Sequence, residues 1–265
     1  MKYLHTDWQQ TLNSIELVNF DAWWNLDAKP VEAPNTIAGK PNAWSHVCSL
    51  KTAEGKTLYL KRQQDFYPKN LLQRFCKQLT FTREFKNYHL VKSAGVIVYD
   101  LIYFESRIKN GHRQAIYVAE GLDGFISLDK LIPIWNANGW PPRTDRRRIL
   151  SPLLETIKNL HRHGILHNAL SPRHLFFNLS TDHPYDIPDK IDFRLIDFER
   201  LKKLNQRSDK PIQRDLFTLH RRGLHWPNSD RVWFLKNYLE ISKLTPEAKT
   251  IIREFQKRAK KKHEN

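Results

Sequence analysis

Residues 160–178 read LHRHGILHNALSPRHLFFN, and this stretch decides how the chain is interpreted. Apolar residues recur with helical spacing over 146–163 just before it, and Gly164 follows where a helix can end. A polar loop over 167–174 comes next, and the apolar run LFFN then predicts a short strand. A second apolar run, DFRLIDF, ends near Asp197. We therefore expect a helix, a loop rich in polar side chains and two short strands.

The preceding part of the chain predicts an antiparallel sheet. One strand pair is WSHVCSL, from Trp44, and TLYLKRQ, joined at the Glu-Gly turn at 54–55. A second pair is VIVYDLIYF and QAIYVAE, joined at the Asn-Gly turn at 110–111. Short apolar runs separated by such turn residues are typical of hairpins.

One helix is predicted between these strand pairs, over residues 80–93. Thr80 is expected to be its N-cap, and Gly95 its C-terminal stop. Glu84 falls on the apolar face of this helix, where a carboxylate needs a cationic partner. Lys61 in TLYLKRQ is the candidate, so we expect a Lys61–Glu84 ion pair. The alternative for Lys61 is a surface lysine on an edge strand.

The balance of 44 basic against 28 acidic residues gives a formal charge of +16 and predicts an anionic partner. Basic runs occur at 143–148 (RTDRRR), 200–203 (RLKK) and 257–262 (KRAKKK), and the alternative is that they are solvated helix ends. No nucleic-acid motif is visible, so nucleic acid is not the favoured partner. No apolar run approaches the roughly 18 residues that span a membrane. The first residues lack the apolar core of a secretory signal, which predicts a cytoplasmic protein.

Taken in order, these features resemble the parts of a protein kinase: a strand lysine, a helix glutamate, a catalytic-loop histidine and a metal-binding aspartate. The resemblance implies an α+β, bilobal fold. An N-terminal lobe, residues 1–120, would hold the antiparallel sheet and one helix. A mainly helical C-terminal lobe, residues 121–265, would hold the catalytic loop. Lys61 would contact the α- and β-phosphates of ATP, and Glu84 would hold it in place.

The family can be narrowed on several motifs. The histidine-bearing loop, Asp-Phe-Glu at 197–199, the Trp-Trp pair at 23–24, LYLKRQ and the Arg-Asp pair at 214–215 resemble the lipopolysaccharide kinase family. This family includes Kdo and heptose kinases and InaA-like proteins, and the resemblance covers about residues 23–238. It implies ATP and Mg²⁺ as cofactors and a sugar hydroxyl of the lipopolysaccharide inner core, or another anionic glycolipid, as acceptor. It also implies peripheral contact with the anionic face of the inner membrane.

The resemblance also assigns site residues, with two departures from the kinase pattern. Ala169 stands where kinases keep the catalytic aspartate, which brings the chain closer to the InaA-like members, and Gly39 is the only glycine available before the first strand. The expected metal ligands are Asp197 and His174. The candidate catalytic residues are His167, Arg173 and His174, and the candidate cofactor-binding residues are Gly39, Lys61, Glu84, Glu120 and Leu122.

Two functions follow from this assignment. The first is an ATP- and Mg²⁺-dependent kinase. The second is a pseudokinase that binds a nucleotide or glycolipid as a regulatory protein, since Ala169 removes the usual base. We also expect Asp215 to hold the loop through its backbone, the competing interpretation being a charge at a helix N-terminus.

Overall fold

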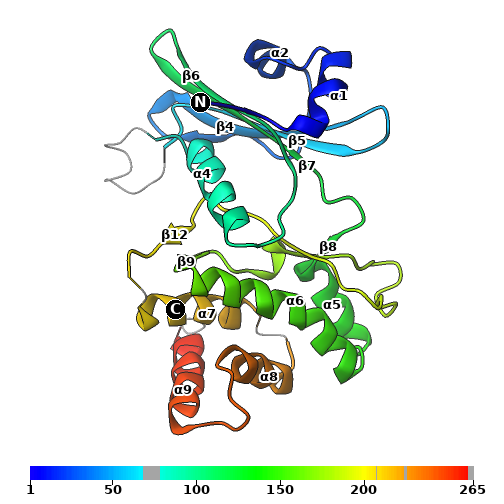
Figure 1. Cartoon of the computed structure of the whole chain (residues 1–265), viewed down its shortest axis with the longest axis vertical. Coiled ribbons are helices and arrows are strands. Elements are labelled where there is room, and N and C mark those ends of the chain that lie inside the picture. The colour runs from blue at the N-terminus through cyan, green and yellow to red at the C-terminus, as the bar shows by residue number, and fades with distance from the viewer. Residues whose placement is uncertain (68–77, 207, 224–225, 262–265) are drawn as a thin grey trace. The chain divides into compact units, whose positions relative to one another are not determined.

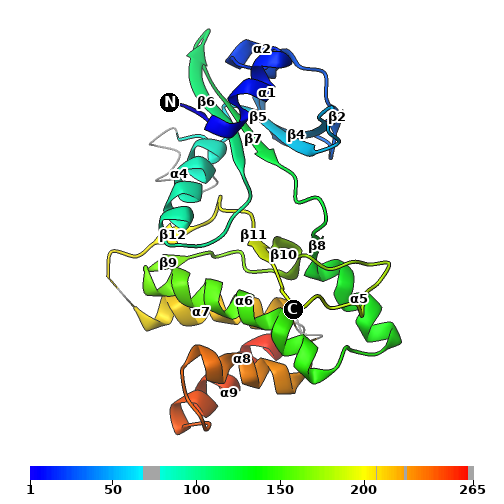
Figure 2. The ribbon, with the colours of Figure 1, turned by 45° about the vertical axis from the view of Figure 1, so that its right-hand side comes forward.

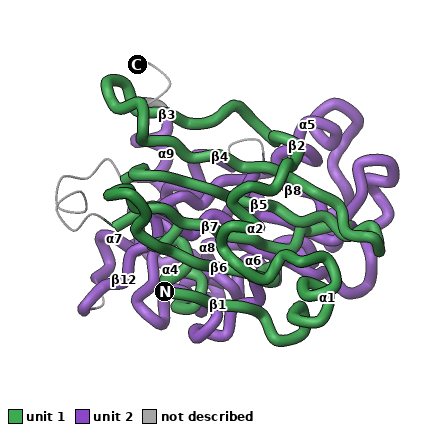
Figure 3. The backbone as a smooth tube through the Cα atoms, turned by 90° about the horizontal axis from the view of Figure 1, so that it is seen from above, with its two compact units in different colours: residues 1–90, 99–123 green, residues 91–98, 124–265 purple. Residues whose placement is uncertain are grey.

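The computed structural model describes residues 1–67, 78–206, 208–223 and 226–261. The chain divides into two compact units (Figure 3). Unit 1 contains residues 1–90 and 99–123, and unit 2 contains residues 91–98 and 124–265.

Within the described part of unit 1, seven strands form one antiparallel sheet in the order β1-β6-β7-β5-β4-β2, with β3 also paired to β4 (Figure 1). The strands are β1 (Lys2–Leu4), β2 (Lys29–Pro30), β3 (Asn35–Ile37), β4 (Lys40–Lys51), β5 (Thr57–Gln64), β6 (Leu101–Lys109) and β7 (His112–Glu120). The helices are the short 3-10 helix η1 (Thr6–Trp8), α1 (Gln9–Ser14), α2 (Phe20–Asn25) and α4 (Thr80–Ser93).

The two faces of this sheet are covered by different helices, α1 and α2 on one and α4 on the other (Figures 1 and 2). Because successive strand residues point to opposite faces, Leu58 and Leu60 pack with the buried residues of α1 and α2, whereas Lys61 points to α4. Phe85 of α4 stacks on Phe104 of β6 at 4.1 Å between ring centroids. The alternation of β5 thus places a lysine beneath α4.

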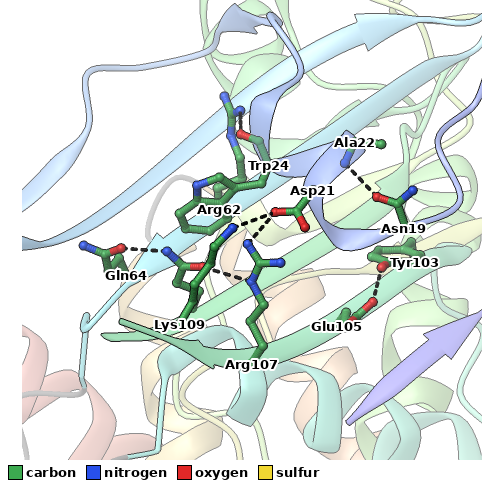
Figure 4. Close-up of polar contacts among 11 residues, drawn as sticks. Asn19, Asp21, Ala22, Trp24, Arg62, Gln64, Tyr103, Glu105, Arg107 and Lys109 are labelled. Atoms are coloured by element: carbon green, nitrogen blue, oxygen red, sulfur yellow. Dashed lines mark hydrogen bonds and ion pairs between the residues drawn. The ribbon is translucent and has the colours of Figure 1, made fainter. Parts of the chain in front are cut away.

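Charged side chains attach α2 to the sheet (Figure 4). Arg62 of β5 donates to the carbonyl oxygens of Trp24, at 2.7 Å, and Leu26, at 3.0 Å. Asp21 accepts from Arg107 of β6 at 2.7 Å. Asn19 caps α2 by accepting from the amide of Ala22 at 2.9 Å. Helix α2 is thereby fixed to β5 and β6.

Unit 2 combines helices with two small sheets. Its helices are α5 (Leu128–Asn138), α6 (Arg143–Arg162), the 3-10 helix η2 (Pro172–His174), α7 (Asp209–Arg222), α8 (Asn228–Tyr238) and α9 (Pro246–Lys261). Strands β8 (Ile126–Ser127), β10 (Leu175–Phe177) and β11 (Phe193–Leu195) form one sheet, and β9 (Ile165–Leu166) and β12 (Lys202–Lys203) form the other. The expected α+β class with an antiparallel sheet is confirmed.

Several local predictions need correction. The strand VIVYDLIYF begins only at Leu101. Thr80 does not cap α4, because its hydroxyl donates to the side chain of Gln63 at 2.6 Å. The run RTDRRR is not simply a solvated helix end: Arg146 and Arg147 of α6 face the fully buried Asp230 of α8. These side chains are committed to packing between elements, which local sequence does not reveal.

Candidate functional site

In unit 1 the predicted ion pair is present. Lys61 Nζ lies 2.7 Å from Glu84 Oε1, and the Glu84 side chain is only 4% exposed. Lys61 also lies over the ring of Tyr117, with its Nζ 5.1 Å from the ring centroid. The pairing places a partly exposed cation, 24% accessible, on the α4 face of the sheet.

Two buried tyrosines complete this polar cluster. The hydroxyl of Tyr99 donates to Glu84 Oε1 at 3.4 Å and lies 2.6 Å from the hydroxyl of Tyr117. Burial, followed by the negative charge of Glu84, raises the pKa of Tyr99 well above its ordinary value. Burial also raises the pKa of Tyr117. Both phenols are therefore neutral hydrogen-bonding groups, and sequence analysis missed them because apolar strands contain tyrosine for packing as often as for polar contacts.

The other predicted cofactor-binding residues of unit 1 are Gly39, Glu120 and Leu122. Gly39 forms the turn between β3 and β4 with a φ of +72°, a conformation that favours glycine. Glu120 ends β7, and its carboxylate pairs with Lys56 at 3.1 Å. Leu122 follows after Gly121 and is half-buried. Their roles toward a nucleotide stay predictions.

In unit 2 the loop after β9 is held by Asp215. Its carboxylate accepts from the amide of His167 at 2.7 Å and from the amide of Asn168 at 2.8 Å. It also lies 3.3 Å from His161 Nε2. Asp215 lies in the middle of α7 rather than in its first turn, so loop anchoring is confirmed and the helix-terminus interpretation is wrong.

His167, a predicted catalytic residue, is completely buried. Its Nε2 donates to the carbonyl oxygen of Ile196 at 3.0 Å, since a carbonyl can only accept. Burial lowers the pKa of this imidazole, although the charges of Asp215 and Asp197 oppose the shift. A neutral, enclosed ring with one nitrogen bound to the backbone can position the loop, but it offers no exposed surface to a substrate.

His174 and Asp197, the predicted metal ligands, lie together. His174 Nδ1 donates to the carbonyl oxygen of Ala169 at 2.8 Å, which directs its Nε2 toward Asp197 Oδ2 at 3.3 Å. Metal-binding histidines commonly donate their second nitrogen to a carbonyl in this way. Asp197 has a φ of +68°, so the residue adopts the left-handed conformation at the end of β11.

The Asp197 carboxylate fits Mg²⁺ bound together with phosphates, whereas the imidazole nitrogen of His174 is a less usual ligand for this ion. Mg²⁺ is usually held by one or two protein ligands, with waters and phosphate oxygens completing its shell. Across the described ranges, no group of three or more His, Cys, Asp or Glu side chains could hold a metal ion.

Two further assigned loop positions are Ala169 and Arg173, and their roles stay predictions. Ala169 is buried and supplies only its backbone carbonyl, to His174. Arg173 is exposed, within η2.

Comparison with known proteins identifies the family. Residues 21–238 match the sequence profile of the lipopolysaccharide kinase (Kdo/WaaP) family. The chain belongs to this family. The resemblance drawn from the loop and strand motifs is thereby confirmed.

Individual members of the lipopolysaccharide kinase family are also similar. Protein InaA of Escherichia coli (strain K12) is 26% identical over 205 residues, which cover 76% of this chain and 87% of InaA. The solved structure of WaaP in complex with acyl carrier protein matches with a TM-score of 0.70 and 17% identity, covering 98% of each chain. The structural match supports the kinase-like fold.

Membership of the lipopolysaccharide kinase family supports a phosphotransferase role connected with lipopolysaccharide. The family also implies the use of ATP. Within the described residues, no helix is both long and apolar enough to cross a membrane.

Proposed function

We propose that this protein is an ATP- and Mg²⁺-dependent kinase that phosphorylates a sugar hydroxyl of the lipopolysaccharide inner core. The observation that carries the proposal is the Lys61–Glu84 ion pair at 2.7 Å. Kinases need this pair to hold a phosphate-binding lysine in place. A buried carboxylate held by a half-exposed lysine is hard to explain by stability alone, because burying a charge pair gives little net stabilisation.

The proposed nucleotide-binding roles belong to each unit by itself. Lys61 would bind the α- and β-phosphates, and its contacts with Glu84 and Tyr117 would keep the ammonium group from turning toward solvent. Asp197 and His174 would hold Mg²⁺, which neutralises phosphate charge when it is bound with the nucleotide. Asp215 and His167 would keep the loop backbone in the conformation that presents His174.

Proton removal from the acceptor hydroxyl is the step for which the site has the fewest suitable side chains. Ala169 carries no base, and His167 is enclosed. General base catalysis contributes roughly 10²- to 10⁴-fold, so a kinase without it is slow but keeps the larger effects of positioning and charge neutralisation. We propose that His174, whose side chain is 13% exposed, serves either as this base or as a metal ligand, and that Arg173 steadies the γ-phosphate.

The test is a transfer assay with ATP, Mg²⁺ and purified core glycolipid, run beside a thermal shift titration of ATP with and without Mg²⁺. We expect Mg²⁺-dependent stabilisation by ATP and slow transfer of label in the native chain. Asp197→Asn should abolish both Mg²⁺ dependence and transfer. Equal behaviour of this variant and the native chain would contradict the proposal.

Ala169 favours a second candidate function, a pseudokinase that binds nucleotide or glycolipid without turnover. It predicts ATP stabilisation in the native chain and no transfer. Ala169→Asp would then produce new transfer, whereas robust transfer by the native chain excludes this candidate.

A further inference from the structure

Four arginines of unit 2 gather around the loop that carries His174. Arg173 lies in η2, Arg200 follows Asp-Phe-Glu, and Arg221 and Arg222 are the last two residues of α7. We call these four residues the arginine cluster. Three of them are exposed, and Arg221 is half-buried.

Hydrogen bonds to the loop fix the cluster in place. Arg222 Nη1 donates to the hydroxyl of Ser171 at 3.4 Å. The backbone carbonyl of Arg200 accepts from the side chain of Asn168 at 3.2 Å. Arg173 is part of the same loop. Three segments distant in sequence therefore meet at one short piece of chain, which Arg222 contacts through its guanidinium group and Arg200 through its backbone carbonyl.

No carboxylate in the described ranges forms an ion pair with these four arginines. Among the residues that the structure describes, none of the four arginines makes an ion pair, unlike Arg146 with Asp230 or Arg162 with Glu240. Burial and the positive charges of Arg221, Arg173 and Arg200 together lower the pKa of Arg222. Neighbouring like charges repel one another, and an anion bound among them would relieve this repulsion.

The chemistry of the cluster favours phosphate. A guanidinium group donates two parallel hydrogen bonds, which match the oxygens of a phosphate, and several guanidinium groups around one dianion supply both charge and geometry. The nucleotide has other partners in the proposed function, namely Lys61 and a metal held by Asp197 and His174. Within the cluster, the Arg222 side chain bonds to Ser171 and the Arg200 backbone bonds to Asn168, rather than to that metal pair.

We propose that the arginine cluster binds a phosphate group that the acceptor already carries beside the hydroxyl to be phosphorylated. This inference rests on the proposed function and narrows its substrate to phosphorylated sugars.

The experiment measures binding to the full chain without nucleotide, by isothermal titration at low salt. The probes are glucose 6-phosphate, inorganic phosphate, glucuronate and glucose. We expect the two phosphates to bind, glucuronate to bind more weakly and glucose not at all. Arg222→Gln should weaken phosphate binding about tenfold, the effect of losing a hydrogen bond to a charged group. Arg253→Gln, an exposed arginine of α9, is the matched control and should leave binding unchanged.

Thermal unfolding of the free protein separates this role from a structural one. If the cluster exists for a ligand, Arg222→Gln relieves repulsion and leaves the melting temperature equal or higher. A clear drop in melting temperature without loss of phosphate affinity would overturn the proposal. Arg221→Gln provides an independent second variant.

Lys61→Met separates the phosphate site from the nucleotide site. We expect this variant to lose stabilisation by ATP and to keep phosphate binding. If phosphate binding disappears in Lys61→Met and persists in Arg222→Gln, the phosphate occupies the nucleotide site and the inference is wrong. If ATP fails to bind while phosphate binding depends on the arginines, the proposed function fails and the phosphate site stands.

Discussion

At the scale of single residues, Glu84 of unit 1 is a charged group whose burial requires a partner. Its side chain is almost fully buried, and its polar partners include Lys61 and the hydroxyl of Tyr99. Removing the cation would leave a carboxylate with only neutral donors in a desolvated position. The pair therefore links stability to the proposed phosphate-binding lysine.

Lys61→Met should lower the free energy of unfolding by about 2 kcal/mol, because the nearly buried Glu84 carboxyl group loses its cationic partner. Adding Glu84→Gln to this variant should recover part of the loss, since the neutral amide is less costly to bury. Urea unfolding of the two variants checks the expectation. Equal stabilities of the single and double variants would mean that Glu84 does not depend on Lys61.

His220 predicts a pH dependence of stability. Burial and the nearby Arg231 lower its pKa to about 4, against about 6.5 for an unperturbed histidine. The unfolded chain therefore binds a proton that the folded chain excludes, so this contribution is present above about pH 6.5 and is lost as the pH falls toward 4. Urea unfolding between pH 7 and about 4 should show the decline, and His220→Gln should make it shallower. An unchanged slope in the variant would contradict this source.

The site residues differ in how readily they can be predicted from the sequence. Lys61, Glu84 and Asp197 could be singled out because a charged side chain within or beside an apolar strand or helix face requires a partner or a function. Tyr99, Tyr117 and the pairing of His174 with Ala169 could not, because they depend on which strands become neighbours and on loop backbone geometry. His167 looked catalytic in the sequence, and only its burial shows that it orders the loop.

At the scale of elements, helix α7 is an anchor for the loop after β9. One carboxylate on this helix, that of Asp215, accepts two consecutive loop amides. Asn168 adopts a φ of +60° within the anchored segment, so the bonds hold a backbone that asparagine tolerates better than most residues.

Asp215→Asn should destabilise the protein by about 2–3 kcal/mol, because the amide oxygen replaces two charged acceptors and the new NH₂ group faces backbone donors. Hydrogen exchange at the amides of His167 and Asn168 should become faster than in the native chain. Asp209→Asn, in the first turn of the same helix, is the control and should change stability by no more than about 0.5 kcal/mol. Unchanged exchange at the two loop amides in Asp215→Asn would show that the loop is held by other contacts.

Elements were predictable where their pattern is long and periodic. The helix over 80–93 matches α4, and the helix over 146–163 overlaps α6, because each carries several turns of apolar spacing. Helix α5 was missed, and it contains Pro133, which argues locally against a helix. Strands β8, β9 and β12 have two residues each, so pairing with distant segments defines them rather than any pattern of their own.

At the scale of the whole molecule, the charge of +16 is the dominant property. Part of it is balanced internally, as at Asp230, which faces Arg146 and Arg147. The C-terminal helix α9 still carries a dense basic segment. We propose that this excess charge brings the protein to the anionic face of the inner membrane.

The protein should therefore bind vesicles that contain phosphatidylglycerol, and not vesicles of phosphatidylcholine alone, in a sedimentation assay. Neutralising lysines 257, 260, 261 and 262 to glutamine should weaken binding by about 1 kcal/mol per cation. Raising the salt concentration should weaken it further, because screening shortens the reach of surface charge to about 10 Å at 0.1 M. Equal binding to both vesicle types would point to an apolar rather than an electrostatic attachment.

Because Asp197 has a left-handed backbone conformation, the charge of this proposed metal ligand can be removed without a change of the backbone. Asparagine adopts this conformation at least as readily as aspartate, whereas alanine does not. An amide at this position thus switches off the negative charge while the turn behind β11 keeps its form, and a methyl group would disturb both at once. Loss of metal binding and loss of architecture can consequently be told apart at a single site in the chain.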